Sequence, residues 1–184
     1  MAIGIKVKKA FADCEPDASK FFGTPTVPLA WEETFDEDEI FFFQIRLRDI
    51  AALDTENRLP HSGYLYVFLH TEDGEYGLEA DVRYCDSEPE LAIDDFNLAV
   101  EGFEQYNNAY LMEFERQDAD FEGTRLFGEP SDWNYAEHAP DLLMQFDPLD
   151  NDMGFLDHID GLFYLFFGQD PLDLSQVYLQ MEYS

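Results

Sequence analysis

The feature that most constrains the fold of this 184-residue chain is an internal repeat of three short blocks. Each block occurs once in the first half of the chain and once in the second half, in the same order and with similar spacing. The paired blocks are 22–25 (FGTP) with 127–130 (FGEP), 43–45 (FQI) with 144–146 (MQF), and 63–68 (GYLYVF) with 161–166 (GLFYLF). Such a repeat predicts a duplicated unit in which neither copy buries its apolar face without the other.

The repeated positions combine a corner, a strand that carries glutamine, and a central aromatic strand. We place the repeat units at 21–70 and 126–168 and expect their aromatic strands to be equivalent. The structural positions of the first copy are Gly23, Pro25, Gln44, Gly63, Tyr66 and Phe68. Those of the second copy are Gly128, Pro130, Gln145, Gly161, Tyr164 and Phe166.

Apolar periodicity in the rest of the chain is mostly typical of strands. One longer helix is predicted over 98–114, because five aromatic or leucine side chains recur there at helical spacing. Gly102 and the pair at 107–108 weaken that helix, and a pair of irregular strands is the alternative. The sequence therefore predicts an α+β fold: a mostly antiparallel sheet built from two related repeats around one core, with one longer helix and a few short helical turns.

The charge of the chain excludes whole classes of ligand. Its 41 Asp and Glu residues outnumber 10 Lys and Arg residues, which gives a formal net charge of -31 at pH 7. Nucleic-acid binding depends on lysine and arginine, and anionic membranes repel such a chain, so we expect neither partner. The chain is nevertheless 46% hydrophobic and contains 18 Phe, which predicts a packed core in a single domain over 1–184.

Targeting and cysteine signals favour a cytoplasmic protein. The longest apolar runs, 64–69 and 162–167, are much shorter than the roughly 20 residues of a membrane-spanning helix. The first residues alternate in polarity and lead into acidic residues, which is unlike a signal peptide. Cys14 and Cys85 lack the close spacing of zinc or redox motifs, and reduced thiols are typical of the cytoplasm.

The same blocks carry a family resemblance. The corner at 22–25 before Pro28 and Trp31, the strand at 42–47 (FFQIRL), and 59–60 (LP) before 63–68 form its front half. Its back half consists of 126–130 (LFGEP), 142–147 (LLMQFD), 160–166 (DGLFYLF) and a last strand that ends near 182–183. The chain resembles the YwqG-like family of bacterial domains of unknown function over most of its length from residue 20 onward.

Two departures from the YwqG-like pattern stand out. The family has a longer N-terminal helical region, and its first corner has paired glycines where this chain has Phe22 and Gly23. The resemblance implies a mixed antiparallel sheet in a bacterial protein. It implies no activity, because the family has none assigned.

Sequence signals for metal binding and catalysis are weak. An acidic loop contains Asp147, Asp150, Asp152, Asp157, His158 and Asp160. It fails the EF-hand pattern, because Phe155 stands where glycine is required and Gly161 where glutamate is required. We therefore predict no metal and no cofactor. The four histidines show no zinc-protease spacing, no nucleophile elbow is present, and no catalytic residue is assigned.

Two interpretations of the acidity stay open at the level of sequence. It is either a solvating shell or a docking surface for a basic protein. The docking interpretation points to Glu33, Asp36 and Asp38 in the segment 32–39, and to Asp150, Asp152 and Asp157 in 147–160. We prefer an immunity-like or inhibitor-like binder of a basic protein, with an enzyme less favoured. The alternative is a small hydrolase or ligand-binding enzyme with a cleft between the repeats, and the oligomeric state is left open.

Overall fold

The computed structural model describes residues 1–9, 15–72, 75–101, 104–131, 141–149 and 161–183. The strands in this part of the chain are β1 (Ala2–Lys9), β2 (Lys20–Phe21), β3 (Thr26–Val27), β4 (Glu39–Arg46), β5 (Tyr64–Glu72), β6 (Glu75–Cys85), β7 (Leu91–Ala92), β8 (Tyr110–Gln117), β9 (Arg125–Leu126), β10 (Leu142–Phe146), β11 (Gly161–Phe166) and β12 (Tyr178–Tyr183). The helical elements are short 3₁₀ turns: η1 (Leu29–Trp31), η2 (Leu47–Asp49), η3 (Phe96–Ala99), η4 (Glu104–Asn107) and η7 (Leu174–Gln176).

The fold of the described residues is β-rich and mostly antiparallel, and it contains no α-helix. The prediction of an α+β fold with one longer helix is therefore wrong, whereas the expectation of a mostly antiparallel sheet is confirmed. Within the same residues, no helix has the length and apolarity that crossing a membrane requires.

The predicted helix over 98–114 is replaced by short turns and the strand β8. The buried amide of Asn97 accepts a hydrogen bond from the backbone of β4 at 2.8 Å and donates to the carbonyl of Tyr106 at 2.9 Å. A continuous helix would use that carbonyl internally, so these bonds favour separate turns. Tyr110 and Met112 are buried with a less buried residue between them, which is the period of a strand.

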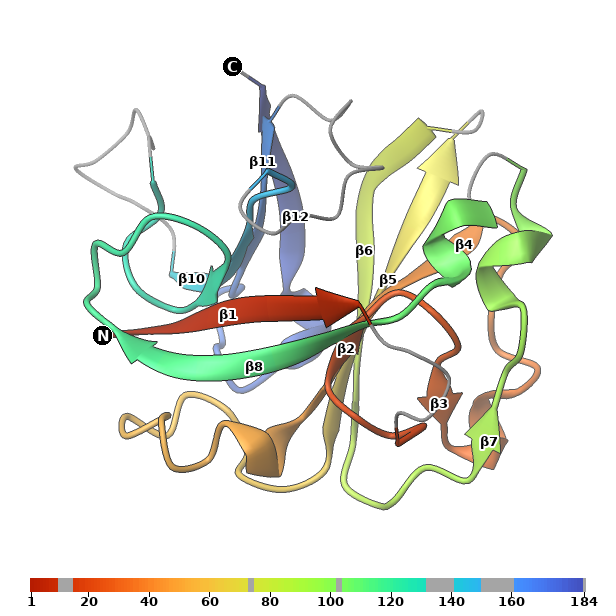
Figure 1. Ribbon diagram of the computed structural model, residues 1–184, viewed down its shortest axis with the longest axis horizontal. Coiled ribbons are helices and arrows are strands. Elements are labelled where there is room, and N and C mark those ends of the chain that lie inside the picture. Colours follow the sequence, from red (N-terminus) through yellow and green to blue (C-terminus); the bar gives the residue numbers. More distant parts are fainter. Residues whose placement is uncertain (10–14, 73–74, 102–103, 132–140, 150–160, 184) are drawn as a thin grey trace. The chain divides into compact units, whose positions relative to one another are not determined.

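The chain divides into two compact units. The first unit is Val7–Met112, and the second unit combines Met1–Lys6 with Glu113–Ser184. The strand order within the first unit is β8-β2-β4-β5-β6, and within the second unit it is β12-β11-β10-β9-β1 (Figure 1). The segments 21–70 and 126–168 therefore belong to different units. A common origin by duplication and a single domain with one core stay predictions.

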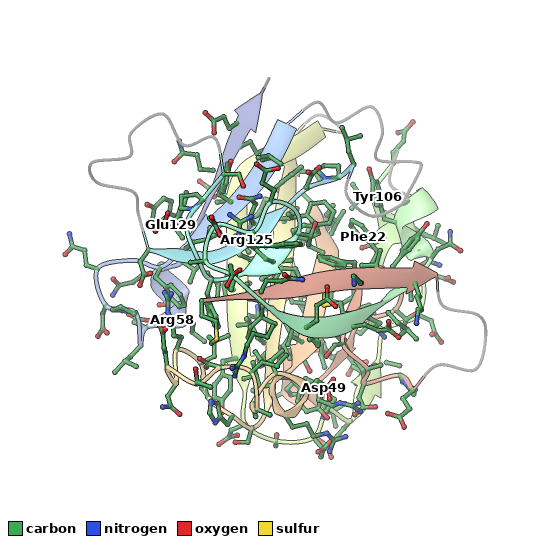
Figure 2. The ribbon with its side chains drawn as sticks, turned by 60° about the vertical axis from the view of Figure 1, so that its left-hand side comes forward. Phe22, Asp49, Arg58, Tyr106, Arg125 and Glu129 are labelled. Atoms are coloured by element: carbon green, nitrogen blue, oxygen red, sulfur yellow. The ribbon has the colours of Figure 1, made fainter. Side chains whose placement is uncertain are left out.

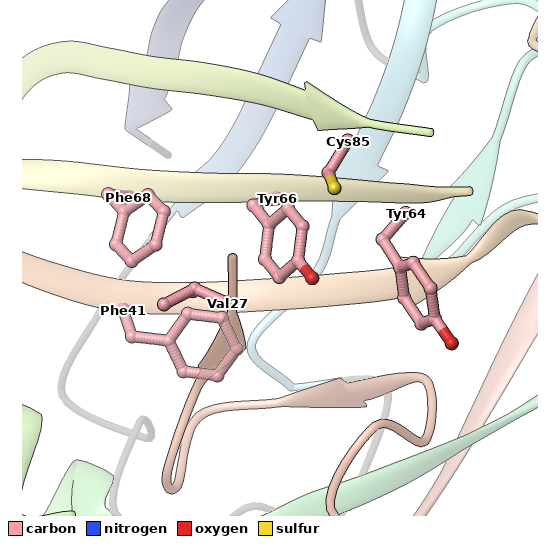
Figure 3. Packing of buried hydrophobic residues seen from close by; sticks show 6 residues of the cluster. All are labelled: Val27, Phe41, Tyr64, Tyr66, Phe68 and Cys85. Carbon is pink, nitrogen blue, oxygen red and sulfur yellow. The ribbon is translucent and has the colours of Figure 1, made fainter. Parts of the chain in front are cut away.

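β5 is the central strand of the first unit, and it pairs with β4 and β6. Its residues from 64 to 69 are all buried, as their apolar character on both faces predicts. Tyr64, Tyr66 and Phe68 project from one face of β5, close to Val27 and Phe41 (Figure 3). Burial of each large ring stabilises the fold by about 1.5–3 kcal/mol, so this aromatic row is a principal part of the core.

β3 and β7 form a two-stranded ribbon (Figure 1), and its residues Val27 and Leu91 pack against the aromatic row. Leu91, Ile93 and Phe96 pack against the row from the chain around and after β7. Trp31 in η1 packs edge-on against the ring of Tyr66, with 5.3 Å between the ring centroids. Trp31 thus anchors the start of the loop that leads from η1 to β4.

The two glycine-containing corners have the same backbone geometry. Phe22 and Gly23 have φ values of 53° and 78°, and Phe127 and Gly128 have values of 61° and 90°. Left-handed backbone is uncommon for a phenylalanine and acceptable for glycine. A Cβ atom on Gly23 would lie 2.7 Å from the Cβ of Ala109, so the corner also excludes a side chain sterically.

A buried glutamine and tyrosine hold the chain after each corner. In the first unit, the side-chain oxygen of Gln44 accepts the N–H of Thr26 at 3.1 Å, and the Tyr66 hydroxyl donates to the Thr26 carbonyl at 2.8 Å. The second unit repeats both bonds, at 2.9 and 2.6 Å, through Gln145, Ser131 and Tyr164. These matched bonds explain why both glutamines are buried in apolar surroundings.

Each unit also buries a cation on the strand before its corner. Lys20 is 2% exposed and Arg125 is fully buried. The Arg125 guanidinium donates to the carbonyl of Gly123 at 3.0 Å, to the hydroxyl of Ser131 at 3.3 Å and to the carbonyl of Glu129 (Figure 2). Its Nε has no hydrogen-bond partner among the described residues. Burial lowers the pKa of Arg125 because it disfavours the charged form.

Candidate functional site

The candidate site is the acidic segment (32–38), which connects η1 to β4. Its carboxylates are all exposed, and they belong to Glu32, Glu33, Asp36, Glu37 and Asp38. None of them pairs with lysine or arginine within the described part of the chain. Within the described residues, lysine and arginine therefore leave the negative charge of this segment unneutralised.

A stack of aromatic rings on Arg83 holds this segment in place. The central carbon of the Arg83 guanidinium lies 4.5 Å from the ring centroid of Phe35, 5.4 Å from that of Phe68 and 5.5 Å from that of Trp31. Such cation–π contacts contribute about 0.5–2 kcal/mol each, with the larger values in partly desolvated sites. Arg83 therefore links the segment to β5 and β6.

Polar contacts of Arg83 fix the backbone of the segment. Its guanidinium donates to the Thr34 hydroxyl at 2.8 Å and to the Thr34 carbonyl at 3.3 Å. It also pairs with Asp81 on β6 at 2.5 Å and lies 3.6 Å from the carboxylate of Glu39. The loop is consequently tied to the sheet from its middle, not only at its two ends.

Glu39 ends the segment as a buried carboxylate. One of its oxygens accepts the backbone N–H of Asp36 at 2.8 Å, and the other lies 3.8 Å from Nε2 of His70. Burial raises the pKa of Glu39, although the Asp36 N–H and the nearby Arg83 favour its ionised form. Glu39 thus supports the fold of the acidic segment and is not part of its exposed charge.

One group of described side chains has the chemistry of a cation site. Ligand atoms of Asp36, Asp38 and His70 lie within 4.8 Å of one another, and Asp38 lies 3.6 Å from Nδ1 of His70. Two of these three side chains are exposed, as is common on acidic surfaces. The group would offer a divalent cation two carboxylates and one imidazole.

A second polar cluster lies at the opposite end of β5 from His70. The Tyr64 hydroxyl lies 2.9 Å from an Asp17 oxygen and 2.5 Å from a Glu88 oxygen, and Arg46 pairs with Asp17 at 3.4 Å. Burial alone would raise the pKa of Asp17, but the Tyr64 hydroxyl and Arg46 lower it. Burial together with the two carboxylates raises the pKa of Tyr64. Arginine side chains lie beside the acids of this cluster. The cluster therefore ties neighbouring loops together and presents little unpaired negative charge.

His61 also faces a buried acid, and this pair is structural. His61 Nε2 lies 3.5 Å from an oxygen of Asp54, which is 1% exposed. Both Asp54 oxygens already accept backbone N–H groups, from Arg58 and Leu59 at 3.0 Å each. Asp54 therefore caps a loop, and the pair lacks the free carboxylate of a catalytic dyad.

The structure places only half of the predicted acidic patch. Glu33, Asp36 and Asp38 lie exposed in the acidic segment, whereas the predicted second half lies outside the described residues: Asp150, Asp152 and Asp157. The repeat positions lie at the corners (Gly23, Pro25, Gly128, Pro130), on the glutamine strands (Gln44, Gln145) and at or on the aromatic strands (Gly63, Tyr66, Phe68, Gly161, Tyr164, Phe166).

Sequence reasoning missed two residues that position the acidic segment, Arg83 and His70, and it counted Glu39 in the predicted acidic segment 32–39, whereas Glu39 is buried. The signal for Arg83 was present: it is a lone arginine on the polar side of a strand, opposite Val82 and Ala80. No sequence pattern links it to Trp31 and Phe35, because that contact depends on the pairing of β5 with β6.

Comparison with protein-family models and with curated proteins finds no match for this chain. The resemblance to the YwqG-like family therefore stays a prediction.

Proposed function

We propose that this chain is a cytoplasmic docking domain, immunity-like or inhibitor-like, which binds a basic protein through the acidic segment (32–38). The observation that carries the proposal is the set of five exposed carboxylates without lysine or arginine partners in the described structure. Charge of one sign concentrated on a surface accelerates encounters with a partner of the opposite sign.

The rigid base of the segment supports the same function. Arg83 and Glu39 hold the segment at Thr34 and Asp36, so the backbone that carries the carboxylates is positioned before a partner arrives. A preorganised loop loses less conformational entropy on binding than a flexible loop does. The same charges on an unstructured tail would lose more conformational entropy on binding and would therefore contribute less to the affinity.

The structure offers less support for the alternative of a small hydrolase. In the described residues, the acid that faces His61 is committed to capping a loop. The surface hollow beside β12 is lined by Asp141, Phe167, Gly168, Gln169, Gln176 and Tyr178, in which one carboxylate has no histidine, serine or cysteine beside it in the lining.

A pair of charge-reversal variants tests docking. The segment variant carries Glu33→Lys, Asp36→Lys and Asp38→Lys. The control variant carries Glu56→Lys, Asp118→Lys and Asp120→Lys, which reverse exposed acids elsewhere and change the net charge equally. Each protein is titrated with a lysine homopeptide and used in pull-downs from an extract of the native host, at low and high salt.

We expect the segment variant alone to lose the partner and to associate tens- to hundreds-fold more slowly with it at low salt. Both differences should shrink as salt screens the charges. Equal behaviour of the segment and control variants would show that only the net charge matters, which would support the solvating-shell interpretation.

A further inference from the structure

A short apolar turn (28–31) stands directly before the acidic segment. It consists of four consecutive apolar residues, Pro28, Leu29, Ala30 and Trp31. Leu29 is 55% exposed, Ala30 is also exposed, and the other two are partly exposed. Two adjacent exposed apolar residues flanked by two partly exposed ones form a small apolar patch, and a patch rimmed by charge is typical of an interaction site.

The apolar turn is as firmly held as the acidic segment. The N–H of Trp31 donates to the Pro28 carbonyl at 2.9 Å, and the N–H of Glu32 donates to the Leu29 carbonyl at 3.2 Å. The Trp31 ring packs on Tyr66 and under Arg83, so it anchors the turn to the sheet. Leu29 is therefore presented on a fixed base, next to a segment whose backbone the same arginine holds at Thr34.

An apolar centre with a charged rim is the usual arrangement of a protein interface. We infer that the apolar turn is the anchor of the docking surface, and that the partner offers an apolar patch bordered by lysine or arginine side chains. This inference rests on the proposed function and specifies the chemistry of the partner. A second copy of this chain is the poorer occupant, because its own net charge of -31 would repel the acidic segment.

Two helical peptides with the same number of lysines provide the probes. In the first peptide, leucines form an apolar face bordered by the lysines, and in the second peptide serines replace the leucines. Leu29→Ser removes the anchor, and Leu172→Ser removes a leucine that is 87% exposed in the other unit, as the control. Titration calorimetry gives the affinities, and Trp31 emission in a Trp133→Phe background reports locally on the turn.

We expect the wild-type chain to bind the leucine peptide more tightly than the serine peptide. Leu29→Ser should weaken binding of the leucine peptide by about tenfold, which corresponds to partial loss of a buried leucine contact. It should leave binding of the serine peptide unchanged, and Leu172→Ser should change neither. Unchanged melting temperatures confirm that both variants remain folded.

The outcomes separate this inference from the proposed function. One outcome is that both peptides bind equally and Leu29→Ser has no effect, while the triple reversal of Glu33, Asp36 and Asp38 still weakens binding. That outcome would refute the anchoring role of the apolar turn and leave the proposed docking function intact. If the triple reversal has no more effect than its control, docking itself is wrong. Self-association of the wild-type chain in sedimentation that Leu29→Ser abolishes would identify a second copy as the occupant and overturn the inference.

Discussion

Replacement of Gln44 by leucine tests whether the buried glutamine is what fixes the chain after the first corner. The leucine keeps most of the side-chain volume but cannot accept the Thr26 N–H, which Gln44 accepts at 3.1 Å, or donate to the Ala18 carbonyl at 3.0 Å. The carbonyl of Pro16 also loses a donor but keeps the Thr26 hydroxyl at 2.7 Å. Two backbone groups therefore lose their partners.

The size of the expected loss in the free energy of unfolding depends on how well water can replace each lost hydrogen bond. Thr26 is 7% exposed, so its N–H stays without an acceptor, whereas Ala18 is half-buried and its carbonyl is partly accessible. An unsatisfied buried group costs about 1–3 kcal/mol, and we expect Gln44→Leu to lower the free energy of unfolding by about 3 kcal/mol. For a chain of this size the melting temperature should fall by about 6–12 °C.

Gln145→Leu is the matched variant in the second unit. There the Gly123 carbonyl keeps its bond from Arg125 at 3.0 Å, and the N–H of half-buried Ser131 can reach water. We expect a loss of only about 1 kcal/mol. Urea unfolding followed by circular dichroism gives both values, and hydrogen exchange should show faster exchange at the Thr26 amide in Gln44→Leu. Equal losses for the two variants, or a neutral Gln44→Leu, would refute this account of the corners.

Three further results are expected. Tyr66→Phe and Tyr164→Phe should each lower the free energy of unfolding by about 1 kcal/mol in urea titrations, because each removes one bond to a carbonyl after a corner; a neutral effect at both sites would contradict the matched role. The melting temperature should rise between 0.01 and 0.15 M salt, as the Debye length falls from about 30 Å to 8 Å and carboxylate repulsion is screened; a flat or falling value would show local compensation. Because burial raises the pKa of Glu39 above its unfolded value, the contribution of Glu39 to stability is greatest at low pH and is lost as pH rises through the folded pKa. Glu39→Gln should therefore gain stability relative to the wild type between pH 4 and pH 7 in calorimetry, and a constant difference would argue against the raised pKa.

Local sequence patterns predicted those parts of the fold that depend on local chemistry. The two-sided apolar run from Tyr64 to Leu69 predicted a central strand, and β5 has that position. The helix over 98–114 failed because Asn97 holds the chain to β4 through bonds that no periodicity records. Tertiary hydrogen bonds outweighed a helical pattern already weakened by Gly102.

The negative charge of the candidate site could be predicted from the sequence, but the residues that hold its backbone in place could not. Glu33, Asp36 and Asp38 stood out because acids are dense there. The role of Arg83 depends on strand pairing that brings it over Phe35, a contact between residues distant in sequence. The sequence shows the apolar turn as four consecutive apolar residues, but only the structure shows that Leu29 in it is exposed.

The division of the chain into units has a consequence for protein synthesis. The first unit, Val7–Met112, is continuous in sequence, whereas the second unit needs β1, whose Ile3 pairs with Leu126. At about 5–20 residues per second, Ile3 waits on the order of ten seconds on the ribosome for its partner. Its apolar strand is available for wrong pairing during that interval, and the exposed lysines Lys6 and Lys8 of β1 counteract such pairing. All residues of the first unit are therefore synthesised before β9, whereas the second unit needs β1 and β9 together.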